Sequence, residues 1–349
     1  MEYRKLGTTD FDVSLICLGT MTFGEQNTEA EGHEQMDYAL DQGINIFDTA
    51  ELYSIPPKAE TQGSTERIIG TWFQNSGKRS DVILATKVVG RSPHMPWFRG
   101  KDHCLDRANI EQALEDSLKR LNTDYIDLYQ LHWPDRAVNN FGTLDFHGGM
   151  YDAKAEEDIL NVLHILQDQI KAGKIRYVGL SNETPWGTMT FLQLAEKHGL
   201  PMMQSVQNQY NLLSRTYDSG MAEVSMHTKC GLLAYSPLAR GRLTGKYLGG
   251  KLPPGSSKTM DTRQSRYDKP RSVQATQDYV AIAEQHGLDA AQMAIAYVNT
   301  KPYVTTNIIG ATSMEQLKTN IAAIDLTLSD EVITAIDNVH KDNPNPSEN

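Results

Sequence analysis

Four residues able to carry proton chemistry follow short hydrophobic runs of the sequence. Asp48 ends the run "INIFD", Lys87 ends "VILATK" and His132 ends "YIDLYQLH", while Tyr53 stands five residues beyond Asp48. A single polar residue in such a place has a simple structural explanation, because strands often end in solvent. Four of them indicate a shared site if the runs are parallel strands, since the chemistry of a barrel gathers at the carboxyl ends of its strands.

These four side chains suit the reduction of a carbonyl group. A tyrosine hydroxyl has a reference pKa of about 10, and a neighbouring ammonium such as that of Lys87 would lower this pKa. Asp48 would pair with Lys87 and keep its amine protonated. His132 could donate a hydrogen bond that orients a carbonyl oxygen. We therefore expect Tyr53 to act as a general acid beside an oxyanion site.

Eight hydrophobic runs alternate with amphipathic stretches, a pattern typical of parallel strands separated by helices. The runs occupy residues 13–19, 44–50, 81–88, 125–132, 175–182, 205–210, 232–238 and 305–312. Thr28 and Thr184 stand where helix N-caps are expected, and Pro185 follows at a favoured first helical position. The count of eight, with no GxGxxG motif after the first run, favours a (β/α)8 TIM barrel of the α/β class over an open sheet.

Three segments depart from this alternation. Residues 2–14 predict a small N-terminal hairpin, and long irregular loops are expected after strand four, at 135–155, and after strand seven, at 239–272. Loops of this length in a compact domain are often functional. We expect a single domain over residues 1–340, followed by a disordered tail at 341–349.

The composition favours an acidic protein of the cytoplasm. The 349 residues include 33 Lys and Arg against 44 Asp and Glu, a formal charge of −11. This charge disfavours nucleic acid and anionic membranes as partners. The sequence has no apolar stretch near the ~20 residues that span a bilayer, and its start lacks a signal-peptide pattern. Three scattered cysteines, Cys17, Cys104 and Cys230, suit a reducing compartment. The sequence gives no prediction about an oligomeric partner.

Two other kinds of site are set aside. The histidines show no pair at metal-ligand spacing, so we expect no metal. The stretch "GRLTGKY" has three residues between its glycines and ends in tyrosine, so it does not fit the P-loop pattern that cradles phosphates.

The sequence resembles the aldo-keto reductase superfamily over about residues 1–340. The similar stretches come in order and include "LGTMTFG" (18–24), "FDTAELY" (47–53), "ATKV" (85–88), "RLNTDYIDLYQLHWP" (120–134) and "GKIRYVGLSN" (173–182). They continue with "VQNQYNLLSR" (206–215), "LLAYSPLARGRLTGKY" (232–247) and "IIGATSMEQLKTNI" (308–321). Within the superfamily, "YSIPPKAETQGSTE" looks most similar to the bacterial Tas-like branch.

This resemblance implies an enzyme that reduces aldehydes or ketones to alcohols with NADPH. It assigns catalysis to Asp48, Tyr53, Lys87 and His132. Near the nicotinamide it implies a set of contacts from several strand ends: Thr20, Met21, Asp48, Ser181, Asn182, Gln207 and Tyr235, the last of which would stack on the ring.

For the rest of the cofactor the resemblance implies residues of the last two strand ends. The pyrophosphate would contact Ser236, Pro237, Leu238, Arg240 and Gly241, the adenosine phosphates Lys246 and Lys258, and the adenine end Gly310, Thr312, Gln316 and Asn320. The glycine after strand eight would open a helix whose N-terminal amides suit an anion. Many relatives carry Glu at the position of Thr319 and Arg at that of Lys258. Both departures bear on the preference for NADPH over NADH, because lysine lacks the planar fork of arginine.

Two other functions agree with parts of this pattern. Some relatives are channel-associated subunits that hold nucleotide and turn over slowly, but their histidine position is altered, so His132 favours an enzyme. A barrel lyase could use Lys87 as a Schiff base. Asp48 opposes that use, because it would keep the amine protonated.

Overall fold

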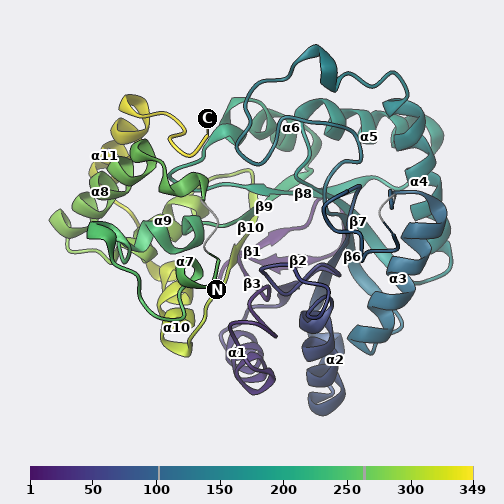
Figure 1. Ribbon diagram of the computed structural model, residues 1–349, viewed down its shortest axis with the longest axis horizontal. Helices are drawn as coiled ribbons and strands as arrows, with labels where there is room; N and C mark the ends of the chain where they lie inside the picture. Colours follow the sequence, from purple (N-terminus) through teal and green to yellow (C-terminus); the bar gives the residue numbers. More distant parts are fainter. Residues whose placement is uncertain (101–102, 262–264, 349) are drawn as a thin grey trace.

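Eight parallel strands close into a barrel at the centre of the molecule (Figure 1). The computed structural model describes residues 1–100, 103–261 and 265–348. In chain order the barrel strands are β3 (Ile16–Gly19), β4 (Ile46–Asp48), β5 (Ile83–Val88), β6 (Ile126–Leu131), β7 (Ile175–Ser181), β8 (Met203–Gln209), β9 (Gly231–Tyr235) and β10 (Val304–Ile309). The last strand pairs with both β3 and β9, which closes the ring. Each strand overlaps a predicted hydrophobic run, and the predicted (β/α)8 barrel is confirmed.

Helices surround the barrel on its outside (Figure 1). They are α1 (Glu29–Asp41), α2 (Ser64–Ser76), α3 (Arg107–Leu121), α4 (Ala155–Lys171), α5 (Pro185–His198), α6 (Met221–Thr228), α7 (Ser257–Met260), α8 (Pro270–Gln285), α9 (Ala290–Asn299), α10 (Met314–Ala322) and α11 (Asp330–Asp342). The predicted caps are present: Thr28 forms a capping box with Glu31, and Thr184 accepts a hydrogen bond from the Gly187 N–H ahead of Pro185. Each cap satisfies an amide that the first helical turn leaves without a partner. In the part of the chain that is described, no helix has the length and apolar character needed to cross a bilayer.

A hairpin closes the amino-terminal end of the barrel. It consists of β1 (Tyr3–Lys5) and β2 (Asp12–Ser14), paired antiparallel. Leu6 and Val13 are buried against the inward-facing Cys17 and Leu128 of the barrel strands. The first predicted run was therefore too long at its start, since Val13 belongs to the hairpin. The hairpin thus fills one end of the barrel interior, and the polar strand ends predicted to form a site lie at the other end.

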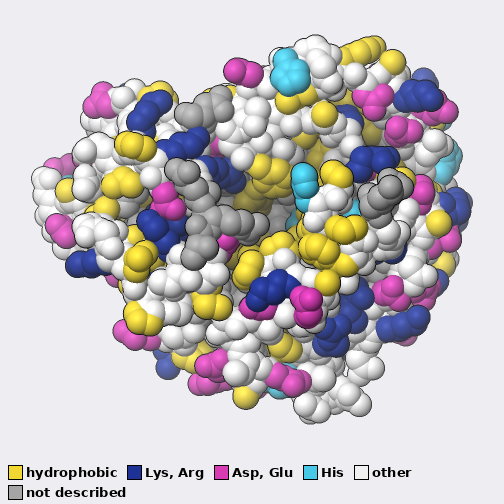
Figure 2. Space-filling model, in the orientation of Figure 1, with side chains coloured by type: hydrophobic (Ala, Val, Ile, Leu, Met, Phe, Trp, Pro, Cys, Tyr) yellow, Lys and Arg dark blue, Asp and Glu magenta, His cyan; other side chains and the backbone are white. Residues whose placement is uncertain are grey.

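Loops at the carboxyl end are long where the sequence predicts them. Between β6 and α4 the loop contains one regular element, a short 3-10 turn (Gly148–Met150). After β9 the chain forms short 3-10 turns and α7 before it reaches α8. These loops border the face of the barrel seen in Figure 2, which is hollowed near its middle and has hydrophobic side chains around the hollow.

The segment after residue 340, predicted to be a disordered tail, is ordered in the structure as far as residue 348. The helix α11 continues to Asp342, and Ser347 is fully buried. The Ser347 hydroxyl donates a hydrogen bond to the Leu213 carbonyl at 2.8 Å, and Glu348 accepts one from the Ser214 hydroxyl. Sequence composition could not reveal this packing, because the tail's partners lie far earlier in the chain, 134 residues away for Leu213 and Ser214 and 74 for Ser272.

Candidate active site

Asp48 and Lys87 form a buried ion pair at the carboxyl ends of β4 and β5. The Lys87 Nζ lies 2.7 Å from Asp48 Oδ2 and 2.8 Å from the Thr49 carbonyl oxygen. The side chains are 0% exposed for Lys87 and 5% for Asp48. A pair removed this far from water is stable only when further hydrogen bonds satisfy its remaining atoms. Neighbouring side chains provide such bonds.

The remaining oxygen of Asp48 is held by amide side chains from across the barrel. Gln207 Nε2 donates to Asp48 Oδ1 at 2.7 Å, and Gln130 Nε2 approaches the same oxygen at 3.4 Å. The Thr20 hydroxyl donates to the Asp48 carbonyl at 2.8 Å. Gln207 and Thr20 were predicted as cofactor contacts and do lie here, whereas Gln130 was missed. Its signal was available, because Gln130 precedes His132 by two residues and so shares its face of the strand.

Tyr53 reaches the ion pair from the loop that follows β4. Its hydroxyl lies 3.3 Å from Lys87 Nζ, which donates the hydrogen bond, and the ammonium is 4.8 Å from the ring centroid. The His132 ring meets the Tyr53 ring edge-on, with centroids 5.9 Å apart. The structure thus brings together all four residues that were predicted to carry the chemistry.

The pKa of Tyr53 differs from the sequence-based expectation. Burial raises it above its ordinary value of 10.0, and the charge of Lys87 lowers it by a smaller amount. The phenol is therefore protonated at neutral pH. For Lys87, burial acts to lower the pKa, but Asp48 and then Tyr53 together outweigh burial and raise it. The Lys87 ammonium lowers the pKa of the phenol, as expected from the sequence. Burial raises this pKa by more, and the extent of burial could not be estimated from the sequence.

His132 is neutral in this environment. Burial, with the charge of Lys87 second, lowers the pKa of His132 well below its ordinary value of 6.5. Its Nδ1 atom is buried without a hydrogen-bond partner among the described residues. A neutral imidazole retains one N–H, so this side chain can donate a hydrogen bond to a bound oxygen.

This shift predicts how pH acts on stability. Below about pH 6.5 the unfolded chain protonates His132 while the folded protein does not, so acid favours unfolding by up to about 1.4 kcal/mol per pH unit. We expect a His132→Gln protein to lose less free energy of unfolding than the wild type between neutral pH and pH ~5. Urea titrations of both proteins at several pH values measure this difference. If the free energy of unfolding fell equally with pH in both proteins, the lowered pKa of His132 would be contradicted.

The next strand ends form a hydrogen-bonded chain beside His132. Asn182 Nδ2 donates to the His132 carbonyl at 2.8 Å, and the Tyr235 hydroxyl donates to Asn182 Oδ1 at 2.7 Å. Ser181 donates to the Gln207 carbonyl at 2.9 Å. Asn182 adopts a left-handed backbone with φ 52°, which asparagine tolerates better than most residues. The predicted nicotinamide contacts from β7, β8 and β9 are therefore connected to the four candidate catalytic residues.

Met21 lies at the edge of this group. It is half-buried, and its carbonyl accepts a hydrogen bond from the Ile55 N–H at 3.0 Å. This bond joins the loop after β3 to the segment that carries Tyr53.

A loop with left-handed residues follows β9. Ser236, Ala239, Arg240 and Gly241 have positive φ values of 57°, 49°, 55° and 82°. Loops of this kind turn successive backbone N–H groups toward a shared concavity that suits anions. At Gly241 an added Cβ would lie 2.9 Å from Lys246 Cε, so glycine permits this lysine to approach. The predicted pyrophosphate residues, including Pro237 and Leu238, form this loop.

Arg240 of this loop and three cations of the segment that follows, Arg242, Lys246 and Lys258, contact carboxylate or aromatic side chains. Arg240 pairs with Asp261 at 3.0 Å, while Arg242 and Lys258 share Asp268 at 2.9 and 3.0 Å. The ammonium and guanidinium groups of Arg242, Lys246 and Lys258 surround the Tyr247 ring at 5.0, 5.3 and 5.9 Å. Arg242 was missed in the sequence, although it stands inside the stretch "ARGRLTGKY". Arg242, Lys246 and Lys258 surround Tyr247, whose buried hydroxyl has no hydrogen-bond partner among the described residues, and this grouping fits a phosphate-bearing cofactor.

The residues predicted for the adenine end bond to one another. Gln316 Oε1 accepts from the Thr312 N–H at 3.1 Å, and Asn320 Nδ2 donates to the Gly310 carbonyl at 3.1 Å. The prediction that Gly310 opens the last barrel helix is wrong. The helix α10 begins at Met314 behind an N-cap serine, Ser313, so Gly310 lies in the preceding loop.

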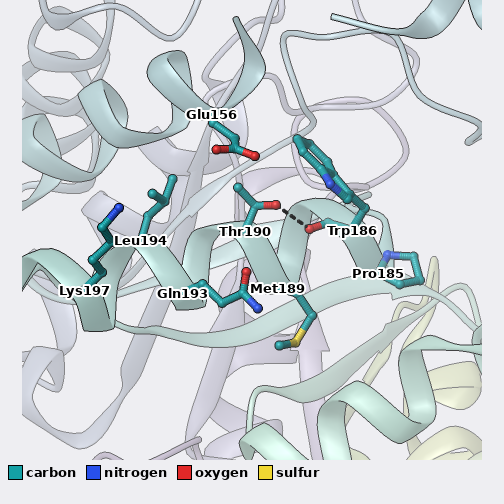
Figure 3. Close-up of a pocket in the computed structure, with 8 residues that line it drawn as sticks. All are labelled: Glu156, Pro185, Trp186, Met189, Thr190, Gln193, Leu194 and Lys197. Carbon is teal, nitrogen blue, oxygen red and sulfur yellow. Dashed lines mark hydrogen bonds between the residues drawn. The ribbon is translucent and has the colours of Figure 1, made fainter. Parts of the chain in front are cut away.

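A cavity of about 560 Å³ lies elsewhere, on the outer helices α4 and α5. Figure 3 shows its lining side chains spread along α5, with Glu156 of α4 opposite. Trp186 borders it and is half exposed. None of the predicted catalytic or cofactor residues lines this cavity, so the candidate site is the carboxyl end of the barrel.

Comparison with known proteins agrees with this geometry. Residues 15–341 match the Aldo/keto reductase family. The chain belongs to that family. It is 48% identical to Protein tas of Escherichia coli (strain K12) over 341 residues, which cover 98% of each chain. It is 33% identical to the uncharacterized oxidoreductase YrpG of Bacillus subtilis (strain 168), over 97% of this chain and 96% of the relative. It is also 30% identical to a putative voltage-gated potassium channel subunit beta of Schizosaccharomyces pombe, over 97% and 93%.

Membership of the aldo/keto reductase family makes the protein an oxidoreductase of carbonyl compounds, in a family that generally uses NAD(P)H. The predicted similarity to the Tas-like branch is confirmed.

Proposed function

We propose that this aldo/keto reductase reduces aldehydes or ketones to alcohols with NADPH, and that Tyr53 is the general acid. The observation that supports this proposal is the constellation of Asp48, Lys87, Tyr53 and His132, with a protonated phenol 3.3 Å from a buried ammonium. A proton donor in this setting can contribute about 10²–10⁴-fold to the rate.

When bound, the cofactor's nicotinamide supplies a hydride to the carbonyl carbon. Tyr53 gives its proton to the carbonyl oxygen, and Lys87 stabilises the phenolate that forms. Asp48 keeps Lys87 charged through the 2.7 Å bond. His132, being neutral, donates a hydrogen bond that orients the same oxygen. Ser181, Asn182, Gln207 and Tyr235 would hold the nicotinamide.

Both rival functions have less support from the site. A Schiff-base lyase needs a neutral lysine, whereas the pKa of Lys87 is raised by Asp48 and Tyr53 despite its burial. A regulatory subunit that only holds nucleotide would have no need for the complete catalytic set. Three cysteines, none in a disulfide, support the cytoplasm as the place where this reductase works.

A substrate panel tests the proposed function. Purified protein is mixed with NADPH and a set of aldehydes and ketones, and the loss of NADPH absorbance is followed together with the alcohol product. We expect turnover with several aldehydes. Tight NADPH binding without alcohol from any substrate would favour the regulatory function instead.

We propose that Lys258 contributes to the preference for NADPH over NADH. Its ammonium shares Asp268 with Arg242, lies 5.9 Å from the Tyr247 ring centroid and, among the described residues, bonds one oxygen of Asp268, so it can turn to a 2′-phosphate. A charged hydrogen bond of this kind contributes about 1.5–3 kcal/mol. Lys258→Ala is therefore expected to weaken NADPH binding by about tenfold or more and NADH binding much less. Fluorescence titration measures both, with the exposed Lys251→Ala as control. Equal weakening of the two cofactors would exclude this role.

A further inference from the structure

A second buried ion pair lies beside the catalytic one. Arg99 Nη1 and Nη2 donate to Glu51 Oε2 and Oε1 at 2.7 and 2.9 Å, a bidentate arrangement. The Glu51 side chain is 1% exposed and that of Arg99 15%. Glu51 Oε1 also accepts from the Val89 N–H at 2.8 Å. Glu51 stands between Asp48 and Tyr53 in the chain, so this pair connects the Tyr53 segment to the loop that follows β5.

That loop carries apolar side chains to the neighbourhood of Tyr53. Phe98 is buried with Leu52, while Met95 and Trp97 are half-buried against the same cluster. Tyr53 and Trp133 pack on this cluster as well. The Trp133 ring lies 4.6 Å from the His132 ring, centroid to centroid. We call Met95, Trp97 and Trp133 the apolar wall.

The loop is held at its base by a different residue. Asp135 accepts hydrogen bonds from the Arg91 N–H at 2.5 Å and from the Leu105 N–H at 2.6 Å. Between these two anchors, Arg99 bonds to the Tyr53 segment through its side chain. It has φ 45°, a left-handed backbone conformation that is unfavourable for arginine. The pair with Glu51 therefore constrains the middle of the loop, where Trp97 and Phe98 stand.

We propose that Glu51 and Arg99 are positioning residues that hold the apolar wall against the catalytic tyrosine and so set a preference for carbonyl compounds with an aromatic or bulky apolar group. This inference rests on the proposed reductase function. Large rings pack well on aromatic side chains, and a wall fixed in place has less freedom to lose when substrate binds. Figure 2 shows hydrophobic side chains gathered beside the central hollow on this face.

The alternative is that the Glu51–Arg99 pair only stabilises the fold. Another buried ion pair of the chain serves as a matched control for this alternative. Arg120 Nε donates to Glu66 Oε2 at 2.7 Å, with side chains 15% and 0% exposed. This pair connects α3 to α2 on the outside of the barrel. Breaking it should cost similar stability while leaving the apolar wall in place.

The experiment compares kcat/KM for benzaldehyde and propanal, with saturating NADPH, in the wild type, Arg99→Met and Arg120→Met. We expect the wild type to favour benzaldehyde, and Arg99→Met to reduce this preference by about tenfold, the scale of a changed apolar contact. Arg120→Met should leave the preference unchanged. Arg99→Lys should recover part of it, since lysine restores the charge but not the bidentate fork. NADPH affinity should stay the same in all of them.

A second variant covers the case in which Arg99→Met does not fold. Trp97→Leu alters a half-buried residue of the wall itself and should also reduce the preference for benzaldehyde. An unchanged preference in a folded Arg99→Met protein would overturn the inference, as would an unchanged preference in Trp97→Leu or an equal loss in Arg120→Met. A wild type that reduces members of the panel but does not favour benzaldehyde over propanal would overturn this inference alone. A wild type that reduces no member of the aldehyde and ketone panel would refute the proposed function, and this inference with it.

Discussion

Replacing Tyr53 by phenylalanine is expected to lower kcat by about 10²–10⁴-fold while NADPH affinity changes little. The substitution removes one hydroxyl, and with it the proton donor that lies 3.3 Å from Lys87 Nζ. The ring keeps its place against His132 and over the ammonium. Steady-state rates with the best aldehyde of the panel measure the loss, and fluorescence titration measures NADPH binding.

Tyr129→Phe is the control for this change. The Tyr129 hydroxyl is buried in the barrel wall and has no hydrogen-bond partner among the described residues, so its removal should cost little. Turnover close to that of the wild type is expected. If Tyr53→Phe retained its activity, or lost NADPH binding together with activity, Tyr53 would be a structural residue and the proton donor would be another group.

Replacing Lys87 by methionine is expected to abolish turnover and to lower the free energy of unfolding by about 3–5 kcal/mol. The change leaves the Asp48 carboxylate in a site that is 5% exposed, where it loses its 2.7 Å partner. An uncompensated buried charge is among the few defects that cost this much. Chemical denaturation followed by circular dichroism measures the loss.

Two further proteins separate charge from packing. The double variant Asp48→Asn with Lys87→Met removes both charges and should recover part of the stability without recovering activity. Lys5→Met breaks an exposed pair with Asp12, whose side chains are 57% and 60% exposed, and should cost less than about 1 kcal/mol. A Lys87→Met protein no less stable than Lys5→Met would show that the Asp48–Lys87 pair is not held as described.

The barrel, and the meeting of the four candidate catalytic residues at one end of it, could be predicted because each depends on local sequence. Parallel strands buried on both faces need continuous hydrophobic runs, and a barrel collects its polar residues where those runs end. Asp48, Lys87 and His132 all lie at such ends. Gln130 could also have been found, because alternation along β6 places it on the face of His132.

Other features depend on partners that are distant in the chain. The Glu51–Arg99 pair joins residues 48 positions apart, and Ser347 and Glu348 of the tail pack on Leu213 and Ser214. In both cases, the sequence around one partner gives no indication of the other partner. The direction of the Tyr53 pKa shift was also beyond sequence, because it depends on how far burial outweighs the Lys87 charge.

The most direct test is a crystal structure of the protein with NADP⁺ and a carbonyl substrate or inhibitor. The distance from Tyr53 Oη to the carbonyl oxygen should be about 2.6–3.2 Å, with Lys87 Nζ still bonded to both Tyr53 and Asp48. A carbonyl oxygen beyond the reach of Tyr53, or a nicotinamide bound away from these three side chains, would contradict the proposed mechanism.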